Sequence, residues 1–345
     1  MIVDELYGLA VWLNREVAPN LGLYDNLASV LEHNARAAQK SAVAEPLQDL
    51  ENMLAAMPME QLSSEQIELL KANGALSYLG KEGLSRFKRI VRSNTFDPVT
   101  AWEEARAAYT VVSETVSKLD SMKRALEAAN VPVQRPFVID EGIVTRLHFK
   151  DKANIGDVAE LKKWSAEWYE IARGLSAAVG EKPEDVRIIG AGTGSLILVL
   201  ATTVAIASTL AVLALRVNTI AKSVLDVLNG IEDLRHKKVL NKTIEDAMKE
   251  QAEAIRASGV AEAVNDVKNQ IGKAINKEVE GQLQKSVEKY FAFTEKGGEI
   301  DMIAPPKLET DEEAEIARDI TQLQDAIESV RLGRSNLQIM LGKDG

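Results

Sequence analysis

The feature that most constrains this chain is an apolar segment, residues 188–215, that contains no charged side chain. Its core, 195–215, matches the length of roughly 20 residues that an α-helix needs to cross a bilayer. Small alanine, serine and threonine residues within it suit close helix packing in lipid, and Arg187 and Arg216 flank it. One interpretation is therefore a single transmembrane helix.

A second interpretation divides the same segment. The glycines within 190–194 favour a turn over the start of a helix, so 195–200 would be a buried strand that pairs with 186–189. Residues 204–215 would then begin a long helix buried between subunits, with the threonine pair 202–203 as its cap. Hydropathy does not separate the two interpretations, and both stay open. The candidate membrane or buried residues are Ser195, Leu196, Ile197, Leu198, Val199, Leu200, Val204, Ile206, Leu210, Val212, Leu213 and Leu215.

Composition favours helices around this segment. Hydrophobic residues make up 46% and aromatic residues 5% of the 345 residues, and alanine, leucine, valine, glutamate and lysine dominate. We predict a mainly α fold with a helical domain at 1–131 and a small α+β module at 132–216 that ends in the apolar segment. Long coiled-coil-like helices should fill 217–345, with a β-hairpin at 290–304.

The predicted N-terminal domain carries clear helix boundaries. Ser63 stands three residues before Gln66, which is the spacing of a capping box. Gly74 supplies a stop signal after the helix that follows. Asp97 and Pro98 mark another helix start, because aspartate accepts backbone N–H bonds and proline suits the first helical position.

The predicted α+β module combines two strands with one helix. Prolines 132 and 136 bracket a linker, and 144–149 alternates like a half-buried strand. Asp157 and Glu160 are placed to cap a helix, and 186–189 is the second strand. The helix has an apolar stripe at helical spacing, made of Leu161, Trp164, Trp168, Ile171 and Leu175.

Three heptad-like seams follow the apolar segment and predict a homo-oligomer. The second seam lies within 260–274 and the third within 316–330. If two seams pair within one chain, a monomer also satisfies the pattern. The first seam, taken as the candidate oligomerisation surface, consists of Val217, Ile220, Val224, Val227, Ile231 and Leu234.

Charge limits the classes of partner. The formal net charge is −11, so we expect no nucleic-acid partner and no electrostatic docking on anionic membrane surfaces. The acidic N-terminus lacks the regions of a signal peptide, and the chain has no cysteine. We therefore expect a cytoplasmic protein, or one associated with the cytoplasmic side of a membrane, with membrane lipid as the remaining candidate ligand.

No residue pattern predicts catalysis, a metal or a cofactor. The glycine-rich run 190–195 has serine where a dinucleotide-binding loop needs its third glycine, and it lacks the lysine of a Walker loop. His33, His148 and His236 are dispersed, without metal-ligand or nucleophile spacing. We predict that the chain is not an enzyme.

Residues 140–240 resemble a family of uncharacterised bacterial helical proteins. The residues that carry this resemblance are Trp164, Trp168, Tyr169, Ile171, Arg173, Gly174, Pro183, Glu184, Asp185, Gly190, Gly194 and Ser195. The resemblance implies a module of a recurring type and transfers no residue role.

Two principal classes of function fit these observations. The first is a non-catalytic, self-assembling structural or interaction protein, tethered to a membrane or part of a larger particle such as a phage virion. The second is a membrane-active protein that inserts 188–215, as pore-forming and ejection proteins do. A third class is an enzyme in the α+β module, for which the sequence offers no motif.

Overall fold

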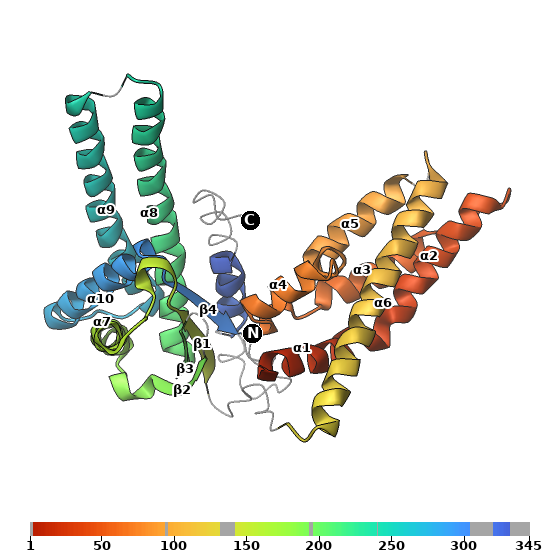
Figure 1. The fold of residues 1–345 in the computed structure, drawn as a ribbon, viewed down its shortest axis with the longest axis horizontal. Helices are drawn as coiled ribbons and strands as arrows, with labels where there is room; N and C mark the ends of the chain where they lie inside the picture. Colours follow the sequence, from red (N-terminus) through yellow and green to blue (C-terminus); the bar gives the residue numbers. More distant parts are fainter. Residues whose placement is uncertain are drawn as a thin grey trace. The chain divides into compact units, whose positions relative to one another are not determined.

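The computed structural model describes residues 3–93, 96–131, 142–192, 196–239, 241–303 and 320–331. The chain divides into two compact units, Met1–Val138 and Ile139–Gly345. In the described residues, helices predominate and one small four-stranded antiparallel sheet lies in the second unit (Figure 1). The predicted fold class, mainly α with a small α+β module, is confirmed.

The first unit is built from helices alone in its described residues. Its α-helices are α1 (Val3–Glu16), α2 (Leu21–Arg36), α3 (Ala44–Ala56), α4 (Ser64–Ala72), α5 (Gly80–Ser93) and α6 (Pro98–Ala128). Short 3-10 turns join several of them. The core holds Tyr24 and Phe87, whose rings meet edge to face with centroids 5.6 Å apart, and leucines from α1 to α4 surround the pair.

The predicted helix boundaries of this unit are confirmed. The Ser63 hydroxyl accepts from the Gln66 backbone N–H at 3.2 Å, and the Gln66 side chain accepts from the Ser63 N–H at 2.9 Å. Gly74 has a φ of +73°, the left-handed conformation that ends α4. The Asp97 carboxylate accepts from the Thr100 backbone N–H at 3.0 Å. Each cap satisfies backbone groups that a helix end leaves unpaired.

In the second unit, several helices pack against the sheet. Its elements are β1 (Ile143–His148), α7 (Val158–Val179), β2 (Arg187–Gly192), β3 (Ile197–Thr202), α8 (Val204–His236), α9 (Lys242–Ile271), α10 (Lys277–Glu295), β4 (Glu299–Ile303) and a helix over 320–331. The strand order is β2-β3-β1-β4, and each neighbouring pair is antiparallel. β1 and β4 are neighbours although α7 to α10 separate them in sequence.

The apolar segment consists of a strand followed by a helix. β3 pairs with β2 on one side and β1 on the other, so a single helix over 195–215 is wrong. The Thr203 hydroxyl then caps α8 by accepting from the Ile206 backbone N–H at 3.2 Å. The strand and the helix of the second interpretation are confirmed, and the first half of α8 is buried in the core of its own chain. The linking residues 193–195 lie outside the described residues.

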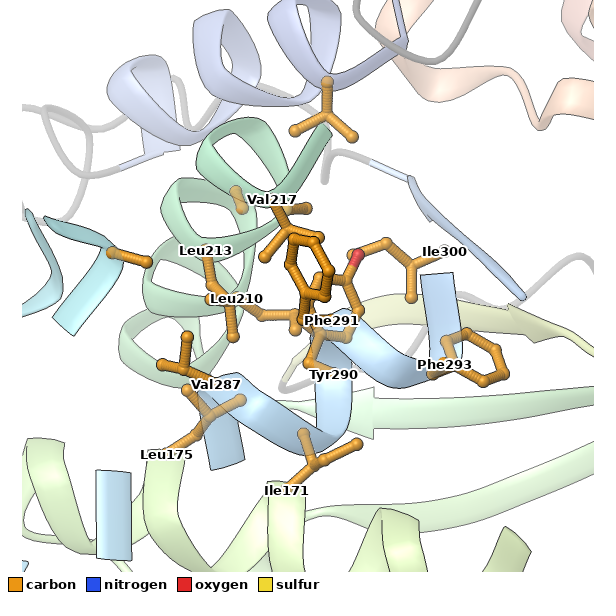
Figure 2. Close-up of a cluster of buried hydrophobic side chains, with 14 of the residues drawn as sticks. Ile171, Leu175, Leu210, Leu213, Val217, Val287, Tyr290, Phe291, Phe293 and Ile300 are labelled. Atoms are coloured by element: carbon orange, nitrogen blue, oxygen red, sulfur yellow. The ribbon is translucent and has the colours of Figure 1, made fainter. Parts of the chain in front are cut away.

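One hydrophobic core unites the sheet and the helices of this unit. Figure 2 shows Leu210 and Leu213 of α8 close to side chains of α7 and α10. Trp168 and Phe293 meet edge to face with ring centroids 5.1 Å apart. The stripe predicted on α7 is buried except for Leu161, which is 41% exposed. Most of the aromatic content of this unit therefore lies where α7 and α10 cross.

Three predictions about this unit need correction. The expected domain boundary at 216 falls inside α8. The β-hairpin over 290–304 is wrong, because 290–295 continue α10 and bury Tyr290 and Phe293 against α7; only β4 is extended, and it pairs with distant β1. Strand β1, where a half-buried strand was predicted, is buried on both faces. The predicted linker at 132–136 lies outside the described residues.

Candidate functional site

The long antiparallel pair α8 and α9 is the most distinctive feature of the second unit. Helices of 33 and 30 residues extend about 50 Å and 45 Å at 1.5 Å per residue. Figure 1 shows them side by side, joined at the end farthest from the sheet. We call residues 222–257 the arm, because the earlier part of α8 and the later part of α9 belong to the core.

The first heptad seam forms the inner face of this pair. Val217, Ile220, Val224 and Ile231 are 0%, 6%, 7% and 4% exposed. Val227 and Leu234 are half-buried. Facing them on α9 are buried small and β-branched residues, among them Ala252, Gly259, Val260, Ala263, Val264 and Val267. The seam predicted to join subunits is therefore filled within one chain.

Close approach and ion pairs fix the register of the two helices. A Cβ on Gly259 would lie 2.6 Å from Cγ1 of Ile220, so glycine is what allows the helices to approach there. Arg216 pairs with Asp266 at 2.5 Å. Near the far end, Arg235 pairs with Glu245 at 3.4 Å. These contacts make α8 and α9 one rod rather than two independent helices.

The third seam also packs inside the chain. Ile320, Leu323, Ile327 and Val330 are all buried, and the last three belong to the same core as α8. Residue 316, where this seam was predicted to begin, lies outside the described residues. Most described residues of the three seams are buried within the chain, whereas Ala274, the last residue of the second seam, is exposed beyond the end of α9.

The candidate apolar residues are distributed between sheet and core. Val199 and Leu200 are buried on β3, while Leu196, Ile197 and Leu198 are half-buried. On α8, Ile206, Leu210 and Leu213 are buried, Val204 and Val212 are half-buried, and Leu215 is 38% exposed. Ser195 lies outside the described residues. The segment thus supplies one strand of the sheet and the central helix of the core.

Length and composition alone would still let α8 cross a membrane. It is the one described helix that passes this test, with a mean hydropathy of 1.8 over its most apolar window. Of that window, 56% is buried inside the chain. A core helix of a soluble protein has the same properties, so this observation is weak evidence for a membrane span.

A cluster of buried charges ties the helix over 320–331 to the sheet. Arg146 of β1 stands opposite Asp301 of β4 in the strand register. Arg331 donates to the Asp301 carboxylate at 3.2 Å and to the Met302 carbonyl at 2.8 Å. Burial lowers the pKa of Arg146 to about 10, Asp301 opposes that shift and Arg331 adds to it. The guanidinium therefore stays charged at neutral pH.

Sequence patterns did not predict this charge cluster. Arg146 lies within an alternating strand, where the prediction assigned polar side chains to solvent. The available signal was that Asp301 also lies within an apolar strand-like run, 299–303. Two opposite charges in apolar strands can satisfy each other only if the strands pair, and that pairing is not local in sequence.

The described glycines of the run 190–195 and the three histidines lie within regular strands and helices. Gly190 and Gly192 lie in β2, and the strand β3 follows the turn; both phosphate-loop motifs require a helix there. His33 and His236 are exposed near the ends of α2 and α8, whereas His148 is buried on β1. The two histidines of the second unit, His148 and His236, lie on different elements and differ in burial.

No known protein family, curated protein or solved structure matches this chain. The proposals that follow therefore rest on the arrangement of its own residues.

Proposed function

We propose that this protein is a non-catalytic interaction protein whose arm projects for contact with a partner. The rest of the second unit, its sheet and packed helices, anchors the arm, and we call it the base. The observation that carries the proposal is the continuity of α8. Its first half is the central helix of a packed core, and its second half, which still gives Val224 to that core, runs beside α9 away from the sheet. A rod anchored in this way keeps its far end at a fixed distance from the base.

The surface of the arm supports an interaction role. Leu228, Val239 and Ile244 are 40%, 57% and 38% exposed, all on the part that leaves the core. Arg256 pairs with Glu295 and lies over the Phe291 ring, 5.3 Å from its centroid, which fixes the root of the arm to α10. Exposed apolar side chains on a rigid projection are typical of contact surfaces.

Assembly through the predicted seams is not part of this proposal, because most of their described residues are buried within the chain. The role suits a component of a larger particle, such as a phage virion, or a protein on the cytoplasmic side of a membrane. In both settings the arm would connect the base to its partner, which is another component of the particle or the membrane.

Site-specific crosslinking tests the proposal directly. The chain has no cysteine, so Thr243→Cys places a unique photocrosslinker at the exposed far end of the arm, and Lys285→Cys places one on exposed α10. In cells that make the protein, the first should give a discrete protein or lipid adduct and the second should not. Equal labelling from both positions would contradict the proposal.

Shortening the arm supplies the matched structural test. Removal of one heptad from each helix, 225–231 and 248–254, keeps the seam in phase and brings the far end about 10 Å closer to the base. The base should stay folded while the Thr243→Cys adduct is lost or changes its position on the partner. An unchanged adduct would mean that the reach of the arm is irrelevant.

A second candidate function is membrane insertion of α8, as in a pore-forming or ejection protein. The hydropathy of α8 favours it. Insertion would require Leu210, Leu213 and Val217 to leave the core. Flotation of the intact protein with neutral phosphatidylcholine vesicles, abolished by Val212→Arg with the fold preserved, would support this candidate; failure of the parent protein to float would contradict it.

A further inference from the structure

The far end of the arm concentrates positive charge in a chain whose net charge is −11. We call residues 236–244 the apex; Leu240 lies outside the described residues. Lys237, Lys238 and Lys242 are exposed, and among the described residues none of the three lies in an ion pair. His236 and Val239 are exposed beside them. The apex contains no acidic residue.

The acidic groups that face the apex lie one turn below it. Glu232 and Glu245 both pair with Arg235, and Glu245 also pairs with Lys249. Asp233 and Asp246 are exposed on the same turn. The carboxylates therefore sit behind the lysines, and the outermost charges that an approaching surface meets are positive.

Lys238 occupies a backbone conformation that lysine does not favour. Its φ is +59°, and the other described non-glycine residues with positive φ are Asn130 and Asp151. Asparagine and aspartate tolerate the left-handed region because their short side chains bond locally, whereas a long side chain gains nothing there. Turn chemistry alone would place asparagine or glycine at 238. Departures of this kind concentrate at functional positions.

The net charge of −11 disfavours docking of the chain as a whole on anionic membranes, but the apex is locally positive. We propose that the apex docks on the surface of an anionic lipid bilayer. This inference rests on the proposed role of the arm and names its partner. Exposed Val239, with Ile244 a turn away, can enter the interface while Lys237 and Lys238 remain at the depth of the phosphates. Two helices side by side present an end about 20 Å across, which suits a flat surface.

The same residues suit nucleic acid less well. Residues 236–244 include no tyrosine, phenylalanine or tryptophan on which a base could stack. Three lysines grouped at one end also do not form the extended track that follows a phosphate backbone. An exposed valine between cations has a use at a lipid interface and none on a phosphate backbone.

Vesicle co-sedimentation of the full chain tests this proposal. The probes are phosphatidylcholine vesicles with and without about 30% phosphatidylserine, because lysines near an anionic surface gain affinity from its negative potential. The protein should sediment only with the anionic vesicles. Raising the salt from about 0.1 M to about 1 M shortens the Debye length from about 10 Å to about 3 Å and should release it.

Charge-reversal variants assign the effect to the apex. Each lysine contributes about fivefold to partitioning, so Lys237→Glu, Lys238→Glu and Lys242→Glu together should reduce binding by about 100-fold or more. The matched control reverses exposed lysines on the base, Lys273→Glu, Lys277→Glu and Lys285→Glu. Both triple variants change the net charge equally, and each alters a lysine at the first residue of a helix. The control should retain most of the binding.

A single substitution separates binding from folding. Lys238→Asn suits the left-handed backbone, so it should slow amide exchange in the arm while it weakens vesicle binding about fivefold. Equal binding to neutral and anionic vesicles, equal losses in the two triple variants, or binding to duplex DNA in preference to anionic vesicles would each overturn the proposal. Crosslinking at Thr243→Cys to a protein, without vesicle binding, would overturn this inference and leave the interaction role of the arm standing.

Discussion

Gly259 offers the sharpest test of the packing between α8 and α9. A Cβ added there would lie 2.6 Å, 2.8 Å and 2.9 Å from Cγ1, Cδ1 and Cγ2 of Ile220. Ordinary contact begins at 3.4 Å, so the gap must widen by about 0.8 Å, which costs about 1–3 kcal/mol for an overpacked site. Two of these three atoms are bonded to the stiff, branched Cβ and cannot swing away.

Helix propensity acts in the opposite direction. Replacing a glycine in the middle of a helix by alanine gains up to about 1 kcal/mol. Gly259→Ala should therefore destabilise the pair by about 1 kcal/mol once both effects are counted. Gly281→Ala is the matched control, because that helical glycine has nothing within 4 Å of an added Cβ, and it should be stabilising.

A double-mutant cycle identifies the contact. Ile220→Ala removes all three crowding atoms and alone should cost about 2–5 kcal/mol. Combined with Gly259→Ala, the loss should be smaller than the sum by about 1–2 kcal/mol, since the added methyl then fills space. Amide exchange over 217–231 measures the opening free energy of the pair. Additive effects, or a gain from Gly259→Ala like that of Gly281→Ala, would refute the intrachain packing.

Two further predictions follow from the buried contacts of the second unit. Asp301→Asn withdraws the negative charge beside buried Arg146 and half-buried Arg331 and should lower the free energy of unfolding by about 3–5 kcal/mol, whereas exposed Asp246→Asn should change it by less than about 0.5 kcal/mol; similar effects in urea unfolding would contradict the cluster's role. Val224→Asp with Ile231→Asp should abolish amide protection in the arm and leave the mass measured by light scattering unchanged. A fall in mass with the arm still protected would return this seam to an intersubunit role.

Local signals in the sequence were sufficient to predict where many helices begin and end. Ser63, Asp97 and Asp157 each cap the helix that they were predicted to cap, and Gly180 ends α7 in the left-handed conformation. These features depend on hydrogen bonds between residues three or four apart. These hydrogen bonds form in any structure that contains the helix, so the ends of a helix can be predicted without knowledge of the fold.

Aromatic residues near 290 show where local signals fail. Tyr290, Phe291 and Phe293 favour strands on average, and the prediction of a β-hairpin followed from them. In the fold Tyr290 and Phe293 lie on the face of α10 that crosses α7, and their burial against Trp164 and Trp168 outweighs a small intrinsic preference. Tertiary packing, worth several kcal/mol per buried aromatic, decided the secondary structure here.

By itself, the sequence determined that most of the apolar side chains in 196–214 leave water, that most seam residues are buried and that the chain is mainly helical. Apolar side chains at these spacings lose free energy whenever they stay exposed, whatever covers them. Only the tertiary structure decided what covers them within the chain: two strands for β3, the core for the first half of α8, and α9 for the first seam. The hydrophobic effect is non-directional, so an apolar pattern specifies only that a face is buried. Shape and paired charges select the surface that covers it. Examples are the gap that Gly259 leaves for Ile220 and the pairing of Arg146 with Asp301.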